Sequence, residues 1–462
     1  MAQFDNSYAR LPAQMFSQTA PTPVKAPELL AFNDALAAQL GLPKDAEIWA
    51  GNQPLEGSMP IAQVYAGHQF GHWNPQLGDG RAVLLGEVLD ASGARFDVQL
   101  KGSGPTPYSR RGDGRAWLGP VLREYVVSEA MHHLAIPTTR ALAATATGET
   151  VIREGLFPGA VITRVASSHI RVGTFQFFAS QDDLEALQAL TDHVIARHAP
   201  HATGPLELLQ HVVQKQADLV AAWMSVGFIH GVMNTDNCSV PGLTIDYGPC
   251  AFMDRYNPRQ VFSSIDQQGR YAYQNQPQIA AWNLAQFATA LLPLMADREQ
   301  AIETFTAAVN AFGPAFQAAW LARFGAKIGL TDATEDDLPM IEALLVLMAK
   351  DGADFTNAFR GLSGQAPQDQ FTDQAAFGAW HEAWLARLGP FEAAKPIMDS
   401  ANPAIIPRNH RIEQMITAAV EGDMAPFHRL GAALRTPFVA SDGDLTRPPS
   451  DAEIVPATFC GT

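Results

Sequence analysis

Residues 230–237 read His-Gly-Val-Met-Asn-Thr-Asp-Asn, and Asp-Tyr-Gly follows at residues 246–248. This part of the chain carries the most chemical information, because Asn237 and Asp246 are both hard oxygen ligands. Ligands of this kind bind Mg²⁺ or Mn²⁺ in proteins. We predict a short strand at residues 244–245, which would direct the Asp246 carboxylate into a cleft. The two motifs together predict a magnesium or manganese site.

The spacing is that of a protein kinase catalytic loop, HRDxxxxN, followed by a DFG motif. In kinases the Asp of the first motif accepts the proton of the substrate hydroxyl. Val232 stands at that position here, and a valine cannot accept a proton. Asp236 is the nearest carboxylate that could replace it, although an Asp in a polar turn is more often a turn former. The chain is therefore either a silent nucleotide-binding protein or an enzyme with a different reaction.

Length and composition indicate a globular protein. At 462 residues the chain exceeds what one hydrophobic core usually organises, and 47% of its residues are hydrophobic. Charged residues make up only 17%, which argues against extended disorder. Nothing in the sequence demands an oligomer, so we expect a monomer.

Charge and targeting signals restrict the partners. The formal net charge is −16, and the local excess of basic residues is limited to Arg110, Arg111, Arg115 and Arg123. Four arginines near glycines suit a small phosphate ligand better than a nucleic-acid duplex. The N-terminus lacks the pattern of a signal peptide, and the most apolar window, residues 279–296, is interrupted by polar residues. We expect a cytoplasmic protein that binds neither nucleic acid nor membrane.

Hydrophobic periodicity predicts a β-rich front and an α-helical back. Helices are expected at residues 28–41 and 118–134. The expected strands are residues 81–89, 96–101, 141–146 with 151–153, and 160–165. Later helices are expected at residues 184–198, 206–226, 278–293, 298–323, 337–350, 372–387 and 410–421. Segregated strands and helices predict an α+β fold.

The order of these elements predicts two parts. Residues 1–170 would form an N-terminal extension and a β-rich N-lobe, and residues 171–462 a helical C-lobe with a C-terminal tail. The boundary is expected between residues 166 and 182. A strand, a strand ending in Lys, a helix with Glu and a further strand follow one another as in a kinase small lobe. We therefore predict a protein-kinase-like, bilobal fold.

Lys101 ends the expected strand FDVQLK, and Glu124 lies in the middle of the expected helix that follows. A lysine leaving a strand can reach phosphate oxygens as a point charge when a carboxylate holds it in place. The alternative is a surface lysine and an exposed helical glutamate. The pair is a candidate phosphate-binding unit.

The tetrapeptide GDGR occurs at residues 78–81 and again at 112–115. Glycines such as Gly78 and Gly80 let backbone N–H groups approach phosphate, and Arg81 would add a bidentate fork. Each copy alone is weak evidence, since GDG is also an ordinary turn. The chain has no GxxxxGK[ST] motif, so a Walker-type NTPase is not indicated.

Arg164 and Arg171 lie in apolar surroundings, the segments AVITRV and SSHIRVG. An arginine in such surroundings needs an anionic partner. A structural salt bridge is one interpretation. A phosphate clamp competes with it because Lys101 and the GDGR loops supply the rest of a site.

These motifs resemble the selenoprotein O family. The resemblance is carried by YAGHQFGHWNPQLGDGRAVLLGEV, QLKGSGPTPYSRRGDGRA, SEAMHHLAIPTTRAL, HGVMNTDN and LTIDYGP, and it extends from FDNSYARLP near the start to Cys460. It implies a pseudokinase fold that works as a protein adenylyltransferase. Such a protein binds ATP in the reverse orientation to kinases and transfers AMP to Ser, Thr or Tyr hydroxyls of protein substrates, releasing pyrophosphate.

The resemblance also implies roles for individual residues. Asn237 and Asp246 would bind Mg²⁺ (or Mn²⁺), and Asp236 would accept the proton. The residues that would contact the nucleotide or position those that do are Gly78, Gly80, Arg81, Lys101, Asp113, Gly114, Glu124, Arg164, Arg171 and Asp246. Two alternatives stay open: a conventional kinase that transfers the γ-phosphate, and a silent ATP-binding scaffold.

The three cysteines, at positions 238, 250 and 460, are too few for a disulfide framework or a zinc site. Many family members pair a C-terminal cysteine or selenocysteine with a cysteine of the activation segment. Here that cysteine is expected near Ser263, whereas Cys250 stands where an apolar residue is expected. A bridge between Cys250 and Cys460 is a hypothesis, and two reduced thiols are the alternative.

Overall fold

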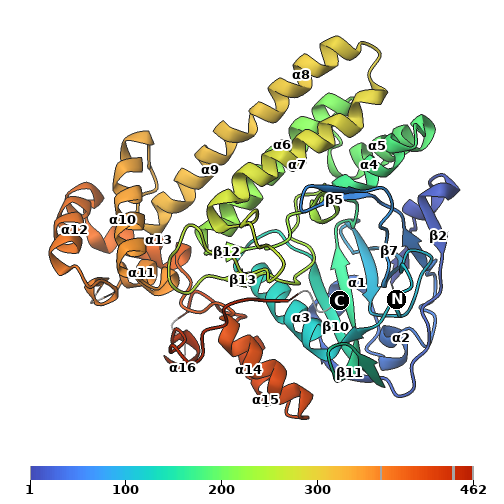
Figure 1. The fold of residues 1–462 in the computed structure, drawn as a ribbon, viewed down its shortest axis with the longest axis horizontal. Helices are drawn as coiled ribbons and strands as arrows, with labels where there is room; N and C mark the ends of the chain where they lie inside the picture. Colours follow the sequence, from blue (N-terminus) through green and yellow to red (C-terminus); the bar gives the residue numbers. More distant parts are fainter. Residues whose placement is uncertain (1, 365–366, 440–442, 460–462) are drawn as a thin grey trace.

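A computed structural model describes residues 2–364, 367–439 and 443–459. Its centre is a large antiparallel sheet built entirely from the first 166 residues, with most of the helices following in the chain (Figure 1). Seven strands lie in the order β2 (Phe16–Gln18), β4 (Ile61–Gln63), β7 (Ala82–Leu89), β8 (Arg95–Lys101), β11 (Leu156–Ala166), β10 (Arg140–Ile152) and β3 (Glu28–Phe32). Two short strands extend this path, β1 (Gln3–Phe4) beside β7 and β9 (Ala116–Trp117) beside β11.

Alternation along the strands divides the apolar side chains between two faces of the sheet. Val83 and Leu85 of β7 pack with the helices α1 (Asp34–Leu40) and α2 (Ala46–Ala50), around the buried Trp49. Leu84 points to the other face, into the larger cluster that includes helix α3 (Leu118–His133). Both faces of the sheet are therefore buried, and α3 is held against the face where Lys101 lies.

The helical part begins directly after the sheet. Helix α6 (Pro205–Ser225) packs against α7 (Gln276–Leu291), α8 (Arg298–Asn310) and α9 (Phe312–Lys327). The other helices are α4 (Val172–Ser180), α5 (Leu184–His198), α10 (Leu338–Asp351), α11 (Phe355–Gly361), α12 (Gln374–Leu388), α13 (Phe391–Ala401), α14 (Asn409–Val420), α15 (Ala425–Ala433) and α16 (Gly443–Thr446). Helices α14 and α15 return to α3.

Two further sheets consist of two short strands each. Strands β5 (Gly67–Gln69) and β6 (His72–Asn74) form one, and β12 (Phe228–Ile229) pairs with β13 (Ala251–Phe252). A single 3₁₀ turn, Thr235–Asn237, carries two of the predicted site residues. No helix within the described residues has both the length and the apolar character needed to cross a membrane.

Most expected elements are confirmed, and the mixed α/β architecture with segregated strands and helices is as predicted. The helix expected at residues 28–41 is wrong for its first part, since Glu28–Phe32 pairs with β10 as a strand. The apolar residues there fit the period of a strand as well as that of a helix. The helix starts only after Asn33, whose side chain accepts a hydrogen bond from Leu36 N. The helix expected at 298–323 is two helices that meet at Ala311.

The strand expected at residues 244–245 is also wrong. Thr244 forms a single bridge with Thr138, and the next-but-one residue, Asp246, has a φ of 66°. A non-glycine residue in the left-handed region ends an extended run. The Asp246 carboxylate is therefore aimed by a turn and not by a strand.

Candidate active site

Lys101 lies between two carboxylates at the end of β8. Its Nζ is 2.8 Å from Glu124 Oε2 and 2.6 Å from Asp246 Oδ1. Glu124 reaches it from α3, and Asp246 from the turn that begins the second motif. Residues distant in the chain thus meet at one ammonium group, as the sequence predicts for Lys101 and Glu124.

Arg164 completes this group from the neighbouring strand. In the pairing of β11 with β8, Arg164 lies opposite Gln99 and Ile162 opposite Lys101, so Arg164 and Lys101 share one face of the sheet. The Arg164 guanidinium contacts Glu124 Oε1, and its Nη2 lies 3.0 Å from Asp246 Oδ1. We call these four residues, Lys101, Glu124, Arg164 and Asp246, the charge network.

Burial makes the charge network sensitive to the loss of any member. The side chains of Glu124 and Arg164 are only 4% and 5% exposed, whereas that of Asp246 is 25% exposed. Burial alone would raise the pKa of both carboxyls, but Arg164 and Lys101 outweigh it and hold both pKa values below their usual range, that of Asp246 well below. Two cations balance two anions, and removing one charge would leave its partner buried and unpaired.

The loop at residues 230–237 is held by hydrogen bonds from its side chains to backbone carbonyls. The His230 ring donates from Nε2 to the Ile245 carbonyl at 2.9 Å, which ties this loop to the residue before Asp246. Val232 is buried, and its carbonyl accepts a hydrogen bond from Asn237 Nδ2 at 3.0 Å. The position of the missing kinase aspartate therefore has a packing role.

Asp236 projects from the 3₁₀ turn and is buried. Its Oδ2 accepts a hydrogen bond from Gln69 Nε2 at 3.1 Å, and its Oδ1 is buried without a hydrogen-bond partner in the part of the chain that the structure describes. Burial raises the pKa of Asp236 to about 6. A carboxylate with one unused oxygen and a raised pKa has the properties of a general base.

Arg171 lies behind Asp236. Its Nη1 donates to the Asp236 carbonyl at 3.3 Å, and its guanidinium stacks over the Tyr65 ring at 4.3 Å. Nη2 is buried, 3.9 Å from Asp79 Oδ1, and makes no hydrogen bond within the described residues. This cationic N–H group retains the capacity to bind an anion.

The first GDGR copy packs against a neighbouring loop. A Cβ on Gly78 would lie 2.5 Å from Tyr108 Cγ, and one on Gly80 would lie 2.9 Å from the Tyr108 carbonyl oxygen. Gly78 also has a φ of 81°, which favours glycine. These glycines are required for close packing whether or not phosphate binds beside them.

The second copy lies farther out. Asp113 is 48% exposed and forms an ion pair with Arg153, with Oδ2 at 2.9 Å from Nη1. Gly114 has a φ of 64° and packs on the Gly104 backbone, where a Cβ would lie only 2.1 Å away. Their predicted role in nucleotide binding is not tested by these contacts.

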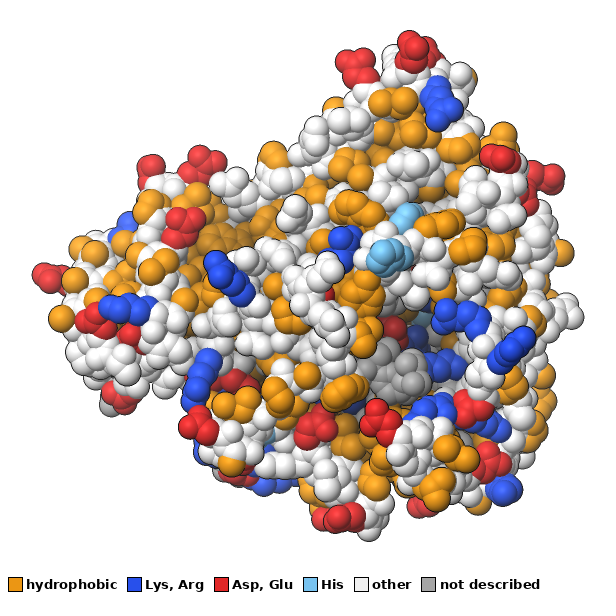
Figure 2. Space-filling model, viewed as in Figure 1, with side chains coloured by type: hydrophobic (Ala, Val, Ile, Leu, Met, Phe, Trp, Pro, Cys, Tyr) orange, Lys and Arg blue, Asp and Glu red, His pale blue; other side chains and the backbone are white. Residues whose placement is uncertain are grey.

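A cavity of about 200 Å³ opens beside the charge network. Arg81, Lys101 and Glu124 line it from the sheet and α3, and residues 455 and 457–459 line it from the C-terminal segment. Figure 2 shows that this face of the molecule is hollowed beside the sheet and that Lys and Arg side chains gather at the rim. The predicted phosphate-binding residues Arg81 and Lys101 thus share one opening.

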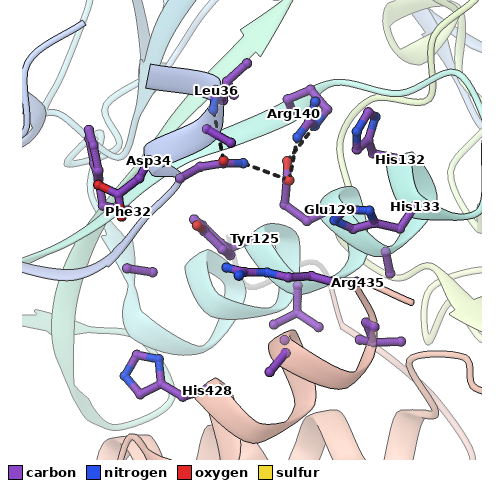
Figure 3. Close-up of a pocket in the computed structure, with 18 of the residues that line it drawn as sticks. Phe32, Asp34, Leu36, Tyr125, Glu129, His132, His133, Arg140, His428 and Arg435 are labelled. Carbon is purple, nitrogen blue, oxygen red and sulfur yellow. Dashed lines mark hydrogen bonds and ion pairs between the residues drawn. The ribbon is translucent and has the colours of Figure 1, made fainter. Parts of the chain in front are cut away.

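A larger cavity, about 920 Å³, lies elsewhere. It is lined by another set of α3 residues, including Tyr125 and Glu129, together with α1, β3 and α15 (Figure 3). Both oxygens of Glu129 are engaged there, since Arg140 Nε and Nη2 each lie 2.8 Å from one of them. None of the predicted site residues lines this cavity, so its size does not make it the active site.

Sequence reasoning missed several residues of the site. Asp79, Tyr65 and Gln69 contact Arg171 or Asp236, yet only the glycines and arginine of the first GDGR copy were singled out. Asp79 lies inside that motif, and this position is the signal that could have identified it. Arg123 was grouped with phosphate-binding arginines, but it is buried and donates to the Gly248 carbonyl at 3.2 Å.

The disulfide hypothesis stays open. Cys250 is buried, and burial raises the pKa of its thiol to about 11. Cys460 lies outside the described residues. The nearby Thr458 donates from its backbone N to the Phe262 carbonyl at 2.7 Å and from Oγ1 to the Pro249 carbonyl at 2.5 Å.

The sheet, the helices and the charge network define a mixed α/β protein whose polar centre is assembled from both parts of the chain. Residues 1–435 match the family model described as "Protein adenylyltransferase SelO". The chain belongs to this family.

Relatives match over nearly the whole length. A protein of Roseobacter denitrificans is 61% identical over 466 residues, covering 100% of this chain and 99% of its own. One of Ruegeria sp. (strain TM1040) is 62% identical, with 99% of each chain covered. One of Rhodopseudomonas palustris (strain BisB18) is 56% identical, again with 99% of each covered. All three carry the name "Protein nucleotidyltransferase YdiU".

Proposed function

We propose that the protein is a nucleotidyltransferase that transfers AMP from ATP to Ser, Thr or Tyr hydroxyls of other proteins. Family membership across residues 1–435 supports the activity. The observation that carries the site is the charge network, in which two buried cations meet two carboxylates beside a cavity. We place the protein in the cytoplasm as a monomer.

We assign the nucleotide phosphates to Lys101, Arg164 and Arg171, with Glu124 holding the first two in place. Arg81, Gly78 and Gly80 would approach the phosphates from the first GDGR loop, and Asp113 and Gly114 from the second. Support comes from the unused N–H of Arg171 and from the opening that Arg81 and Lys101 share. Charge-assisted hydrogen bonds from arginine match phosphate geometry.

We assign Mg²⁺ or Mn²⁺ to Asn237 and Asp246. Both present hard oxygen donors, and the lowered pKa of Asp246 keeps its carboxylate ionised. Asn237 donates with its nitrogen to Val232, which leaves the amide oxygen as its ligand atom. When bound, the metal would neutralise phosphate charge and orient the leaving group.

In the proposed reaction the acceptor hydroxyl oxygen attacks the α-phosphorus. The bond between the α-phosphorus and the oxygen that bridges to the β-phosphate breaks, and pyrophosphate leaves with that oxygen. The hydroxyl proton passes to Asp236, whose Oδ1 has no hydrogen-bond partner within the described residues. Lys101 and the two arginines stabilise the charge that develops on the phosphates.

We further propose that residues 1–170 and 171–462 form the two lobes of a kinase-like fold with the nucleotide between them. Support comes from the sheet, which ends at Ala166, and from the helices that follow. Lys101 and Glu124 belong to the first lobe, and Asp236 and Asp246 to the second.

The decisive experiment incubates the purified protein with Mg²⁺ or Mn²⁺ and ATP labelled at either the α- or the γ-phosphate. Protein-bound α-label that is lost in Asp246→Ala is expected. Transfer of the γ-label alone would identify a conventional kinase. Absence of both labels, with ATP still bound, would identify a silent scaffold.

A further inference from the structure

The β5–β6 hairpin lies directly on the turn that carries Asp236. His68 N donates to Thr235 Oγ1 at 2.7 Å, and Phe70 N donates to Asn234 Oδ1 at 3.0 Å. The Tyr271 hydroxyl donates to the same Asn234 oxygen at 2.7 Å. Two hydrogen bonds thus join the hairpin to residues 234–235, on the N-terminal side of Asp236.

Gln69 is the hairpin residue that reaches the carboxylate itself. Its Nε2 donates to Asp236 Oδ2 at 3.1 Å, while its Oε1 accepts a hydrogen bond from Asn74 Nδ2 at 3.3 Å. The second bond keeps the amide nitrogen turned towards Asp236. The relay Asn74 to Gln69 to Asp236 therefore fixes one carboxylate oxygen.

Two glycines allow this approach. A Cβ on Gly67 would lie 2.8 Å from Asp236 Oδ1, and one on Gly173 would lie 3.4 Å from Asp236 Cα and 2.1 Å from the Ala66 carbonyl oxygen. The hairpin turn has φ values of 52° at Phe70 and 84° at Gly71. The positive φ at Phe70 costs free energy, and the contact of its ring with Tyr271, at 5.0 Å between centroids, helps to hold it.

We propose that Gln69 is a positioning residue for the transfer reaction: its hydrogen bond to Oδ2 sets the orientation of the Asp236 carboxylate relative to the acceptor hydroxyl. This inference rests on the proposed function, since it takes Asp236 as the base. Gln69 touches neither the charge network nor the assigned metal ligands through any hydrogen bond described. Its loss should affect the transfer step and not the binding of ATP.

The test compares Gln69→Leu and Gln69→Glu with His72→Ala. His72 is the cross-strand partner of Gln69, is exposed and serves as the matched control on the same hairpin. We expect Gln69→Leu to lower kcat for α-label transfer by about ten- to a hundredfold, while the Kd for ATP stays within about twofold. Gln69→Glu places a second carboxylate against Asp236, so we expect a larger loss, and His72→Ala should match the wild type.

A double-mutant cycle separates positioning from a general structural effect. In the Asp236→Ala background, Gln69→Leu should lower the residual rate no further. An equal additional loss there, or a kcat of Gln69→Leu equal to that of His72→Ala, would overturn the inference. If Gln69→Leu does not fold, the near-isosteric Gln69→Glu decides by the same comparison.

Failure of the proposed function would look different. It would show as a wild-type protein without α-label transfer, or as full activity in Asp236→Ala. A protein that transfers AMP, depends on Asp236 and ignores Gln69 would contradict only this inference.

Discussion

Lys101 and Lys327 are both buried lysines, one at the end of the sheet and one in the helical part, and their surroundings are opposite in kind. Lys101 touches two carboxylates in the charge network. Lys327, on α9 and 2% exposed, has Nζ 2.9 Å from Asn402 Oδ1 and 4.2 Å from the centre of the Phe359 ring. Burial lowers the pKa of Lys327 to about 7.

The difference shows which buried charge belongs to a site. An amide oxygen and aromatic rings compensate only part of the cost of burying an ammonium group. The carboxylates around Lys101 keep a positive charge in place beside an opening, where it can act on phosphate. Lys327 therefore affects the stability of the fold, whereas Lys101 serves the reaction. The groups that contact the two lysines distinguish them better than their burial does.

The largest effect is expected from Asp246→Asn, which breaks the charge network. The substitution keeps the shape but removes the anion that Lys101, Arg164 and the assigned metal share. We expect α-label transfer to fall by about a thousandfold or more. If the transfer rate of this variant stays within about tenfold of the wild-type rate, the assignment of Asp246 to the site is wrong. Circular dichroism checks that the fold is retained.

Asp236→Asn should come next. An amide cannot take up the proton of the acceptor hydroxyl as a carboxylate does. We therefore expect kcat to fall by about a hundredfold or more, with the Kd for ATP little changed. Calorimetric ATP titration and single-turnover transfer measure the two separately. A large loss of ATP affinity would mean that Asp236 binds nucleotide instead.

The same substitution in both regions sharpens the comparison. Lys327→Met should leave transfer unchanged and raise the free energy of unfolding by about 1–4 kcal/mol near pH 6, where burying the charge costs most. Lys101→Met should lower α-label transfer by about a hundredfold. Chemical denaturation and the labelling assay measure the two effects. A destabilised Lys327→Met protein would mean that the contact with Asn402 outweighs the burial.

Lys327 also predicts a pH dependence. Its pKa is about 7 in the folded protein, below the ordinary value of 10.5, so the unfolded chain binds more protons between these values. The free energy of unfolding should therefore rise with pH from about 7 towards 10, and Lys327→Met should lack this contribution. Equal pH profiles of unfolding free energy for the wild type and Lys327→Met would contradict this prediction.

The smallest effect is expected from Asp113→Asn. Asp113 is half exposed and paired with Arg153, so it contributes little charge to a buried site. We expect KM for ATP to rise about threefold with kcat unchanged. Gly378, exposed on α12 and with no atom within 4 Å to meet a Cβ, offers Gly378→Ala as a control that should leave KM for ATP unchanged. An unchanged KM for ATP would mean that the second GDGR copy does not contribute to the nucleotide site.

Particular residues show how far the sequence could lead. Lys101 and Glu124 were paired correctly from strand and helix order alone, because a strand end and the following helix are close in any such fold. Gln69 was not found, because its string AGHQFGHW carries no spacing that distinguishes a packing hairpin from one that touches a carboxylate. The strand at 244–245 was wrong, since propensity cannot anticipate a left-handed backbone at Asp246.

The sequence by itself determined the family, the α+β order of elements and the residue types that would hold phosphate and metal, because these depend on motifs and periodicity that are local in the chain. Only the tertiary structure decided that Arg164 and Asp246 join the pair of Lys101 and Glu124 in one network. Lys101, Glu124, Arg164 and Asp246 come from two strands, a helix and a turn, and they are brought into one network by strand pairing and by the packing of α3. Contacts between residues so distant in sequence depend on the whole fold, and no local pattern encodes them.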